Sequence, residues 1–192
     1  GQNLFDQALS FSGEWEVDET MERLIAEKKI REAIVVGIEN TGAGRMDEYS
    51  PWSFPGVGKG FGDQYGKFIT ETLKPWVDKE YRTLPDAANT GIMGSSMGGL
   101  ISLYLGFCKP DIFGFIGAMS SSLWWKDDQF LEWARSVRPS GNQVYLDTGT
   151  AEGIRDSLHH VLVRQLLKNG FEDRVDLFYV EEKDAIHHES AW

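Results

Sequence analysis

The sequence is poor in cysteine, in basic side chains and in long hydrophobic runs, and each shortage excludes a class of protein. Its single cysteine, Cys108, rules out an intrachain disulfide framework, and we expect a small buried side chain there. The 19 Lys and Arg residues are outnumbered by 30 Asp and Glu residues, which gives a net charge of −11. Nucleic acids and anionic membranes need a basic surface, so neither is expected as the main partner. No hydrophobic run approaches the ~18 residues of a membrane span.

A chain of 192 residues is long enough for one domain with a full core, and its patterns alternate between strand and helix. Short runs of apolar and β-branched residues predict strands at 33–38, 90–94, 115–119, 144–146 and 175–180. Apolar residues at three- and four-residue spacing predict helices around 21–25, 65–77, 100–104, 130–134 and 154–166. This alternation predicts an α/β fold, a single domain over 1–192 whose mostly parallel sheet carries helices on both faces.

A G-x-S-x-G pattern stands at Gly94-Ser95-Ser96-Met97-Gly98, between a predicted strand and a predicted helix. In that context the serine occupies a sharp strand-to-helix turn, and the flanking glycines let the two elements approach closely. At a helix N-terminus, N–H groups and the helix dipole favour developing negative charge. The pattern therefore predicts that Ser96 is a nucleophile. The alternative is a glycine-rich turn in which Ser96 only caps the helix.

A serine nucleophile needs a base, and the four histidines stand in two adjacent pairs. His159 and His160 fall inside a helical pattern, so we expect a surface and half-buried pair without a catalytic role. His187 and His188 follow the last predicted strand, where the chain order of serine, acid and histidine places the base. Neither pair has the i,i+4 spacing of a zinc-binding helix, and no metal is predicted.

The acid that orients the base is expected in the loop after the predicted strand 144–146. That loop offers three carboxylates: Asp147, Glu152 and Asp156. Spacing alone does not choose among them.

Several segments of the chain carry a recognisable set of motifs. The densest runs from Tyr65 to Tyr104 and includes the G-x-S-x-G segment. The shorter ones are Gly1-Gln2-Asn3-Leu4-Phe5, Gly37-Ile38-Glu39-Asn40 with Arg45 and Glu48-Tyr49 after it, Gly149-Thr150-Ala151-Glu152, and His187-His188-Glu189-Ser190-Ala191-Trp192. With these motifs the chain resembles the esterase family of α/β hydrolases that includes S-formylglutathione hydrolase (esterase D), enterochelin esterases, feruloyl esterase domains and mycolyltransferases.

The resemblance implies an α/β-hydrolase fold and a catalytic triad of Ser96, Glu152 and His187. It also implies that the backbone N–H groups of Met97 and Gln2 form the oxyanion hole. No metal or organic cofactor is implied, and the expected partner is a small-molecule ester. Domains of this family have strands before the segment that opens this chain, one of which lies between the strands predicted at 33–38 and 90–94. Either the sheet closes without that strand or the domain is incomplete at its N-terminus. Because a missing central strand would leave buried backbone groups unpaired, we expect the incomplete domain.

Four side chains are further candidates for the substrate pocket. Arg45 could steer an acidic substrate or pair with a neighbouring carboxylate, and Trp52, Trp124 and Trp125 could line an acyl or aromatic pocket or simply pack. The function expected is hydrolysis of a small or aromatic carboxylic ester through an acyl-enzyme. The alternatives are an acyltransferase of the same fold and a hydrolase-like binding module without catalytic activity.

Overall fold

The structure is a computed structural model that describes residues 3–6, 8, 10, 13–53, 59–125 and 129–188. The strands are β1 (Gly91–Ser95), β2 (Phe115–Met119), β3 (Gln143–Gly149) and β4 (Leu177–Glu182). The α-helices are α1 (Val17–Ala26), α2 (Arg45–Glu48), α3 (Gly62–Lys67), α4 (Lys74–Glu80), α5 (Met97–Cys108), α6 (Gln129–Ala134) and α7 (Ile154–Lys168). Short helical turns are η1 (Gly42–Gly44), η2 (Phe68–Leu73), η3 (Ala87–Asn89) and η4 (Thr150–Glu152).

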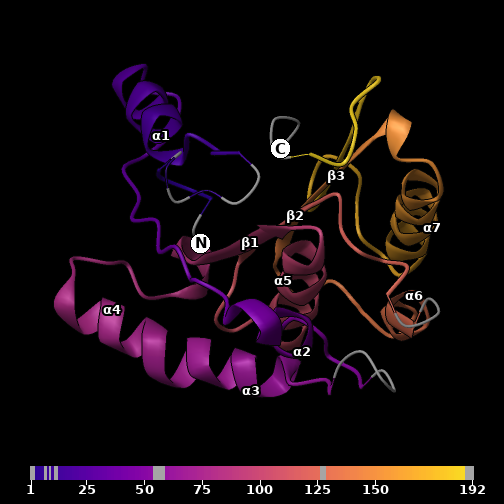
Figure 1. Cartoon of the computed structure of the whole chain (residues 1–192), viewed down its shortest axis with the longest axis horizontal. Helices are drawn as coiled ribbons and strands as arrows, with labels where there is room; N and C mark the ends of the chain where they lie inside the picture. Colours follow the sequence, from indigo (N-terminus) through magenta and orange to yellow (C-terminus); the bar gives the residue numbers. More distant parts are fainter. Residues whose placement is uncertain are drawn as a thin grey trace.

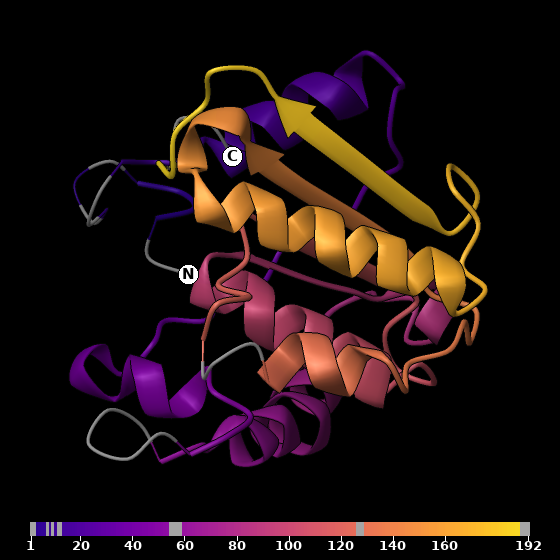
Figure 2. The same cartoon turned by 90° about the vertical axis from the view of Figure 1, so that its right-hand side faces the viewer.

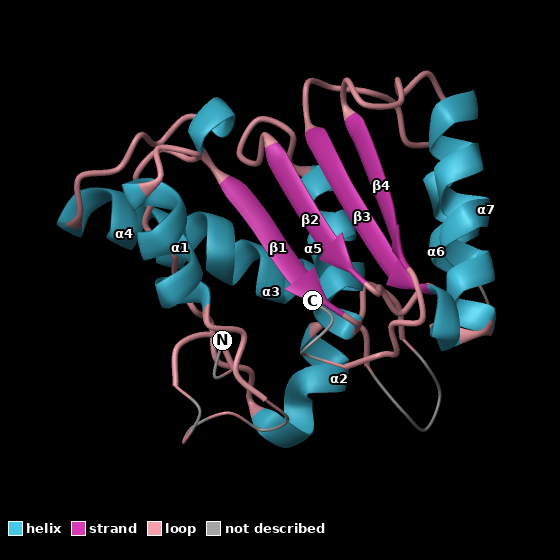
Figure 3. Cartoon of the chain, turned by 90° about the horizontal axis from the view of Figure 1, so that it is seen from above, coloured by secondary structure: helices cyan, strands magenta, loops and turns pink. Residues whose placement is uncertain are grey.

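The four strands form one parallel sheet in the order β1-β2-β3-β4 (Figure 3). Each strand is joined to the next by a crossover that contains α5, α6 or α7. Such crossovers are right-handed, and because the strand order advances in one direction they place all three helices on the same side. Figure 1 shows α5, α6 and α7 on that side of the sheet and α1 on the other.

The core lies between the sheet and these three helices, and Figure 2 shows α7 lying across the sheet beside β3 and β4. Ile116, Val144 and Leu177 are neighbours in register on β2, β3 and β4, and each is at most 1% exposed. The helices bury Leu100 and Leu103 of α5, Phe130 of α6, and Leu162 and Leu166 of α7 against them. Truncating such a side chain to alanine typically costs about 2–5 kcal/mol. This packing fixes the ends of the strands, from which the site is built.

Four of the five predicted strands are confirmed. β2 has the predicted bounds, and β1, β3 and β4 begin and end within three residues of their predictions. The predicted helices are also present, and residues 62–80 form one continuous helix because the π-helical turn η2 joins α3 to α4.

The prediction of a strand at 33–38 is wrong. No ladder pairs this segment within the described residues, and Ile34, Val35 and Val36 are 50%, 43% and 42% exposed. An apolar run becomes a strand only where a neighbouring strand takes up its N–H and C=O groups. Here the segment instead lines a wide cavity together with residues of β1, where Met93 is 65% exposed.

Two smaller observations concern the surface. Cys108, expected to be buried, is exposed, because the last residue of α5 reaches the edge of the packed layer. Among the helices that the structure describes, none combines the length and the apolar composition needed to cross a membrane.

Candidate active site

Ser96 lies in the sharp turn between the end of β1 and the start of α5. Its backbone angles are φ 55° and ψ −121°, a strained conformation for a residue with a side chain. The Ser96 N–H donates to the carbonyl oxygen of Met119 at 2.9 Å, which ties the turn to the end of β2. Gly94 is required, because a Cβ atom there would come within 2.7 Å of the Gly98 backbone. The strand, turn and helix that the G-x-S-x-G pattern predicts are all present.

His187 lies in the loop after β4 and bridges Ser96 and Glu152. Its Nε2 atom is 3.0 Å from Ser96 Oγ, and its Nδ1 atom is 2.7 Å from Glu152 Oε2. When Nδ1–H donates to the carboxylate, the lone pair of Nε2 is left to accept the Ser96 hydroxyl proton. The neighbouring His188 is exposed. The fold thus brings three residues from three different loops into one hydrogen-bonded chain.

Glu152 ends the turn η4 that follows β3, and its side chain is fully buried. Its Oε1 atom accepts a 2.5 Å hydrogen bond from Ser120 Oγ and a 3.0 Å bond from the Gly149 N–H. Burial raises the pKa of the Glu152 carboxyl, but the hydrogen bonds from Ser120, Gly149 and His187 outweigh it and hold the pKa below its ordinary value. The carboxyl beside His187 is therefore ionised at neutral pH.

The two other carboxylates considered for this role are placed differently. Asp147 lies on β3, and its Oδ1 atom accepts the Ser120 N–H at 3.1 Å. Burial raises the pKa of Asp147 to about 6, and the nearby charge of Glu152 adds to that effect. Asp156 falls in the first turn of α7, and its side chain lies outside the described residues.

A run of three serines was not predicted as part of the site. Ser120, Ser121 and Ser122, here called the serine turn, directly follow β2, and each is at most 1% exposed. Ser120 contacts Glu152, as described above, and Ser122 Oγ lies 3.2 Å from Ser96 Oγ. The signal in the sequence was a polar triplet placed directly after a buried apolar strand.

His159 is also placed differently from the prediction. It is fully buried rather than near the surface, and its Nε2 atom accepts the Ser121 N–H at 3.0 Å. The adjacent His160 does lie near the surface, where its Nε2 atom is 2.7 Å from a Glu181 carboxylate oxygen. Successive residues of a helix point in different directions, which separates the two imidazoles.

Comparison with known proteins identifies the family. A family model described as "Putative esterase" matches residues 4–192. The chain belongs to this esterase family. A relative, "uncharacterized protein YbbA" of Bacillus subtilis (strain 168), is 31% identical over 185 residues, which cover 88% of this chain and 72% of the relative.

Solved structures show the fold of this esterase-family chain. An enterobactin esterase from Shigella flexneri matches with a TM-score of 0.75 at 22% identity, over 93% of this chain and 46% of that one. A ferulic acid esterase matches with a TM-score of 0.69 at 18% identity, over 93% of this chain and 72% of that one. This likeness establishes the α/β-hydrolase fold. The chain spans less than half of the enterobactin esterase chain.

The two groups expected to form the oxyanion hole are only partly described. Met97 is the first residue of α5, and the first four N–H groups of a helix have no partner within it. Its amide is therefore available directly beside Ser96. Gln2 lies outside the described residues.

The expected pocket side chains fall into two groups. Arg45 lines the cavity that also reaches Ser96 and His187, and its guanidinium carbon lies 5.4 Å from the centre of the Tyr49 ring. Trp124 is 39% exposed but does not line that cavity. By contrast, Trp52 packs edge-on against Trp133 and other rings of the core, and Trp125 is 5% exposed. Core packing therefore accounts for Trp52 and Trp125, and neither lines that cavity.

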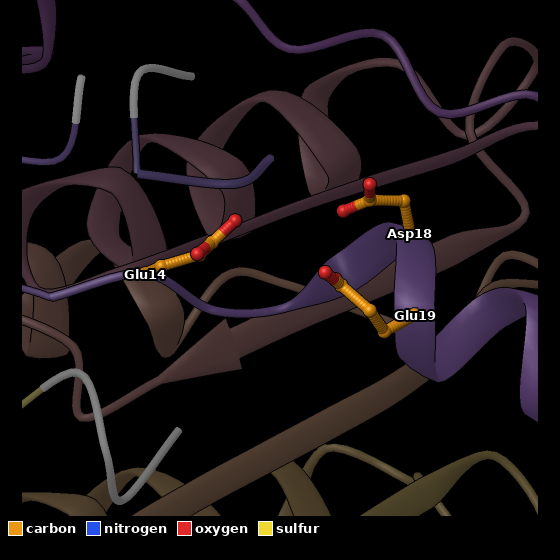
Figure 4. A group of neighbouring side chains, drawn as sticks. All are labelled: Glu14, Asp18 and Glu19. Atoms are coloured by element: carbon orange, nitrogen blue, oxygen red, sulfur yellow. The ribbon is translucent and has the colours of Figure 1, made fainter. Parts of the chain in front are cut away.

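One group of acidic side chains in the described part of the chain is close enough to share an ion. The carboxylates of Glu14, Asp18 and Glu19, near the start of α1, lie within 4.8 Å of one another (Figure 4). Desolvation and the neighbouring carboxylates, Glu19 foremost, raise the pKa of Glu14. Asp18 and Glu19 are exposed, and such surface groups are common without an ion, so the cluster assigns no metal.

Proposed function

We propose that this chain is a serine carboxylesterase that works through an acyl-enzyme. The observation that carries the proposal is the position of His187, which reaches Ser96 Oγ with one ring nitrogen and the buried Glu152 carboxylate with the other. Nucleophilic catalysis by serine needs this pairing of a base with the nucleophile, and an ionised group that fixes the tautomer of the base.

In the proposed reaction Ser96 Oγ attacks the ester carbonyl carbon while its proton passes to His187 Nε2. The carbonyl oxygen becomes an oxyanion, which the Met97 N–H stabilises, with Gln2 proposed as the second donor. When the C–O bond to the leaving alcohol breaks, His187 returns the proton to that oxygen. Water then attacks the acyl-enzyme with His187 as base, which releases the carboxylic acid and restores Ser96.

The proposed substrate is an ester of a small or aromatic acid. Two structural neighbours are named for such activities, an enterobactin esterase and a ferulic acid esterase. Arg45 and the Tyr49 ring lie in the wall of the cavity that reaches Ser96, where a cation and an aromatic face suit a phenolic or acidic acyl group.

The test is hydrolysis of p-nitrophenyl acetate by the parent chain and by Ser96→Ala. We expect turnover to fall at least about a thousandfold in Ser96→Ala, because the substitution removes the hydroxyl that His187 Nε2 contacts. A serine-directed phosphonate should add its mass to Ser96 in the parent. His187→Ala should also abolish turnover, and the matched control is His188→Ala on the adjacent, exposed histidine, which should keep it.

Three outcomes separate the candidates. No hydrolysis and no phosphonate adduct would leave a binding module. An adduct together with transfer of the acyl group to an added alcohol in preference to water would indicate an acyltransferase. Turnover of Ser96→Ala within tenfold of the parent would remove the mechanism.

A further inference from the structure

The serine turn contacts both ends of the proposed triad. At one end the Ser120 hydroxyl donates to Glu152 Oε1 at 2.5 Å. At the other end Ser122 Oγ lies 3.2 Å from Ser96 Oγ, and the Ser122 N–H donates to the Ser96 carbonyl oxygen at 3.0 Å. A displacement of this one turn would therefore move the acid and the nucleophile relative to each other.

The serine turn has a strained backbone that its neighbours contact at several points. Ser120 has φ 43°, in the left-handed region that costs a residue with a side chain of order 1–2 kcal/mol. Its N–H donates to Asp147. At the far end of the turn the Ser122 carbonyl oxygen accepts the backbone N–H of Trp125 at 3.0 Å, and the Trp125 indole N–H donates to Ser50 Oγ at 2.7 Å. The middle residue, Ser121, is held from α7.

His159 supplies that middle support. Its side chain is fully buried, and the Ser121 N–H points at its Nε2 atom from 3.0 Å. A hydrogen bond from the Ser121 N–H needs a lone pair on the acceptor. The Nε2 atom is therefore unprotonated, and the ring proton is on Nδ1. Unlike His187, this imidazole meets a backbone group rather than the hydroxyl of Ser96.

We propose that His159 is a positioning residue of the esterase site. Through the Ser121 N–H it fixes the serine turn, which in turn sets where Ser120 holds Glu152 and where Ser122 holds Ser96. The inference rests on the proposed function, because it assigns His159 a role in the rate of the reaction that Ser96 and His187 perform. The role belongs to the acceptor at Nε2 and not to the volume of the side chain.

The test compares His159→Gln with His159→Met. The two replacements are unbranched and similar in size, but only glutamine carries an oxygen that can accept the Ser121 N–H. We expect kcat for p-nitrophenyl acetate to fall by about tenfold or more in His159→Met with KM changed less than about twofold, and to stay within about threefold of the parent in His159→Gln. Leu166→Ala, on the same helix, and His160→Gln are the controls; both should leave kcat per folded molecule unchanged.

Two further measurements separate the positioning role from a folding defect, and the second of them does not depend on the proposed function. If His159 acts through the serine turn, the effects of His159→Met and Ser122→Ala on kcat should be less than additive. In the parent, ¹⁵N NMR of the imidazoles should show His159 with Nδ1 protonated and Nε2 bare, whether or not the chain is active. A parent without esterase activity would refute the proposed function and, with it, the effect of His159 on the rate; the NMR measurement would still test the contact between His159 Nε2 and the Ser121 N–H. Equal kcat in His159→Gln and His159→Met, or a protonated Nε2 of His159, would overturn the positioning role.

Discussion

Two carboxylates at the end of β3 lie close together and share one donor residue, yet their environments drive their pKa values in opposite directions. Asp147, on the strand, accepts the Ser120 N–H, and burial raises its pKa to about 6. Glu152, in the turn after the strand, also has a buried side chain, yet its pKa stays below its ordinary value. Burial acts in the same direction on both groups.

What separates the two carboxylates is the number of hydrogen bonds each receives and the group it faces. Glu152 takes bonds from Ser120, Gly149 and the His187 ring, and a cationic imidazole in the reaction favours its charge further. Asp147 also feels the negative charge of Glu152, which opposes its ionisation. Because the two pKa values are shifted in opposite directions, the ionised role belongs to the acid with the lower pKa, which is Glu152.

The largest effect is expected for Glu152→Gln. The amide keeps the shape of the side chain but loses the charge that holds the His187 tautomer and stabilises the imidazolium. We expect kcat for p-nitrophenyl acetate to fall by roughly a thousandfold or more, with KM and the unfolding midpoint little changed. A kcat within tenfold of the parent would show that Glu152 is not the acid of the triad.

Ser120→Ala should have a smaller effect on the same carboxylate. It removes one of the hydrogen bonds that hold the pKa of Glu152 down, so that pKa should rise, and the stabilising contribution of the ionised Glu152 should be lost at a higher pH during acid unfolding. We expect kcat at neutral pH to fall by about tenfold. The matched control is Ser121→Ala, because the Ser121 hydroxyl is buried without a hydrogen-bond partner in the part of the chain described. An unchanged pH dependence of unfolding in Ser120→Ala would remove this account of Glu152.

Asp147→Asn should leave the reaction nearly intact, with kcat within about threefold of the parent. The amide oxygen can still accept the Ser120 N–H, while the unfavourable charge is gone. We expect the free energy of unfolding at about pH 8 to rise by about 1–2 kcal/mol. A loss of activity as large as that of Glu152→Gln would exchange the roles of the two residues.

The smallest effect is on the pH dependence of stability, to which Glu152 and Asp147 should contribute with opposite signs. It is measured by urea unfolding of the parent, Glu152→Gln and Asp147→Asn. Glu152 has a folded pKa below its ordinary 4.5, so its stabilising contribution is present above that value and is lost as pH falls through the folded pKa. Asp147 has a folded pKa of about 6, above its ordinary 3.8, so the folded chain binds the extra proton between these values. Its contribution therefore becomes unfavourable as pH rises through that window. Each amide substitution should remove only the contribution of its own carboxyl to the free energy of unfolding as a function of pH. If the two contributions changed with pH in the same direction, the comparison would be contradicted.

Much of the fold could be predicted from local patterns. β2 was predicted with its bounds, and α7 was found from apolar spacing, because both bury one continuous set of side chains. Residues 33–38 have the composition of a buried strand, but whether a run pairs depends on a neighbour that the run itself does not encode. The same limit applies to Cys108, whose burial depends on where α5 leaves the packed layer.

The site was predictable only where chain order and motifs constrain it. Ser96 follows from the glycines around it, and His187 and Glu152 needed the family resemblance to be separated from His188 and Asp147. The serine turn and His159 were not found, because their roles arise from contacts between residues far apart in the chain. A histidine inside a helix carries no local sign of which backbone amide it will meet.

The loop that carries His187 is fastened to the turn that carries Glu152. The Ala151 N–H donates to the carbonyl oxygen of Ala185 at 3.1 Å, and the Asp184 N–H donates to Thr150 Oγ1 at 2.9 Å. A shift of this loop would therefore carry Glu152 and His187 together. It would change the distance from His187 Nε2 to Ser96 Oγ, whereas it would preserve the hydrogen bond between His187 and Glu152.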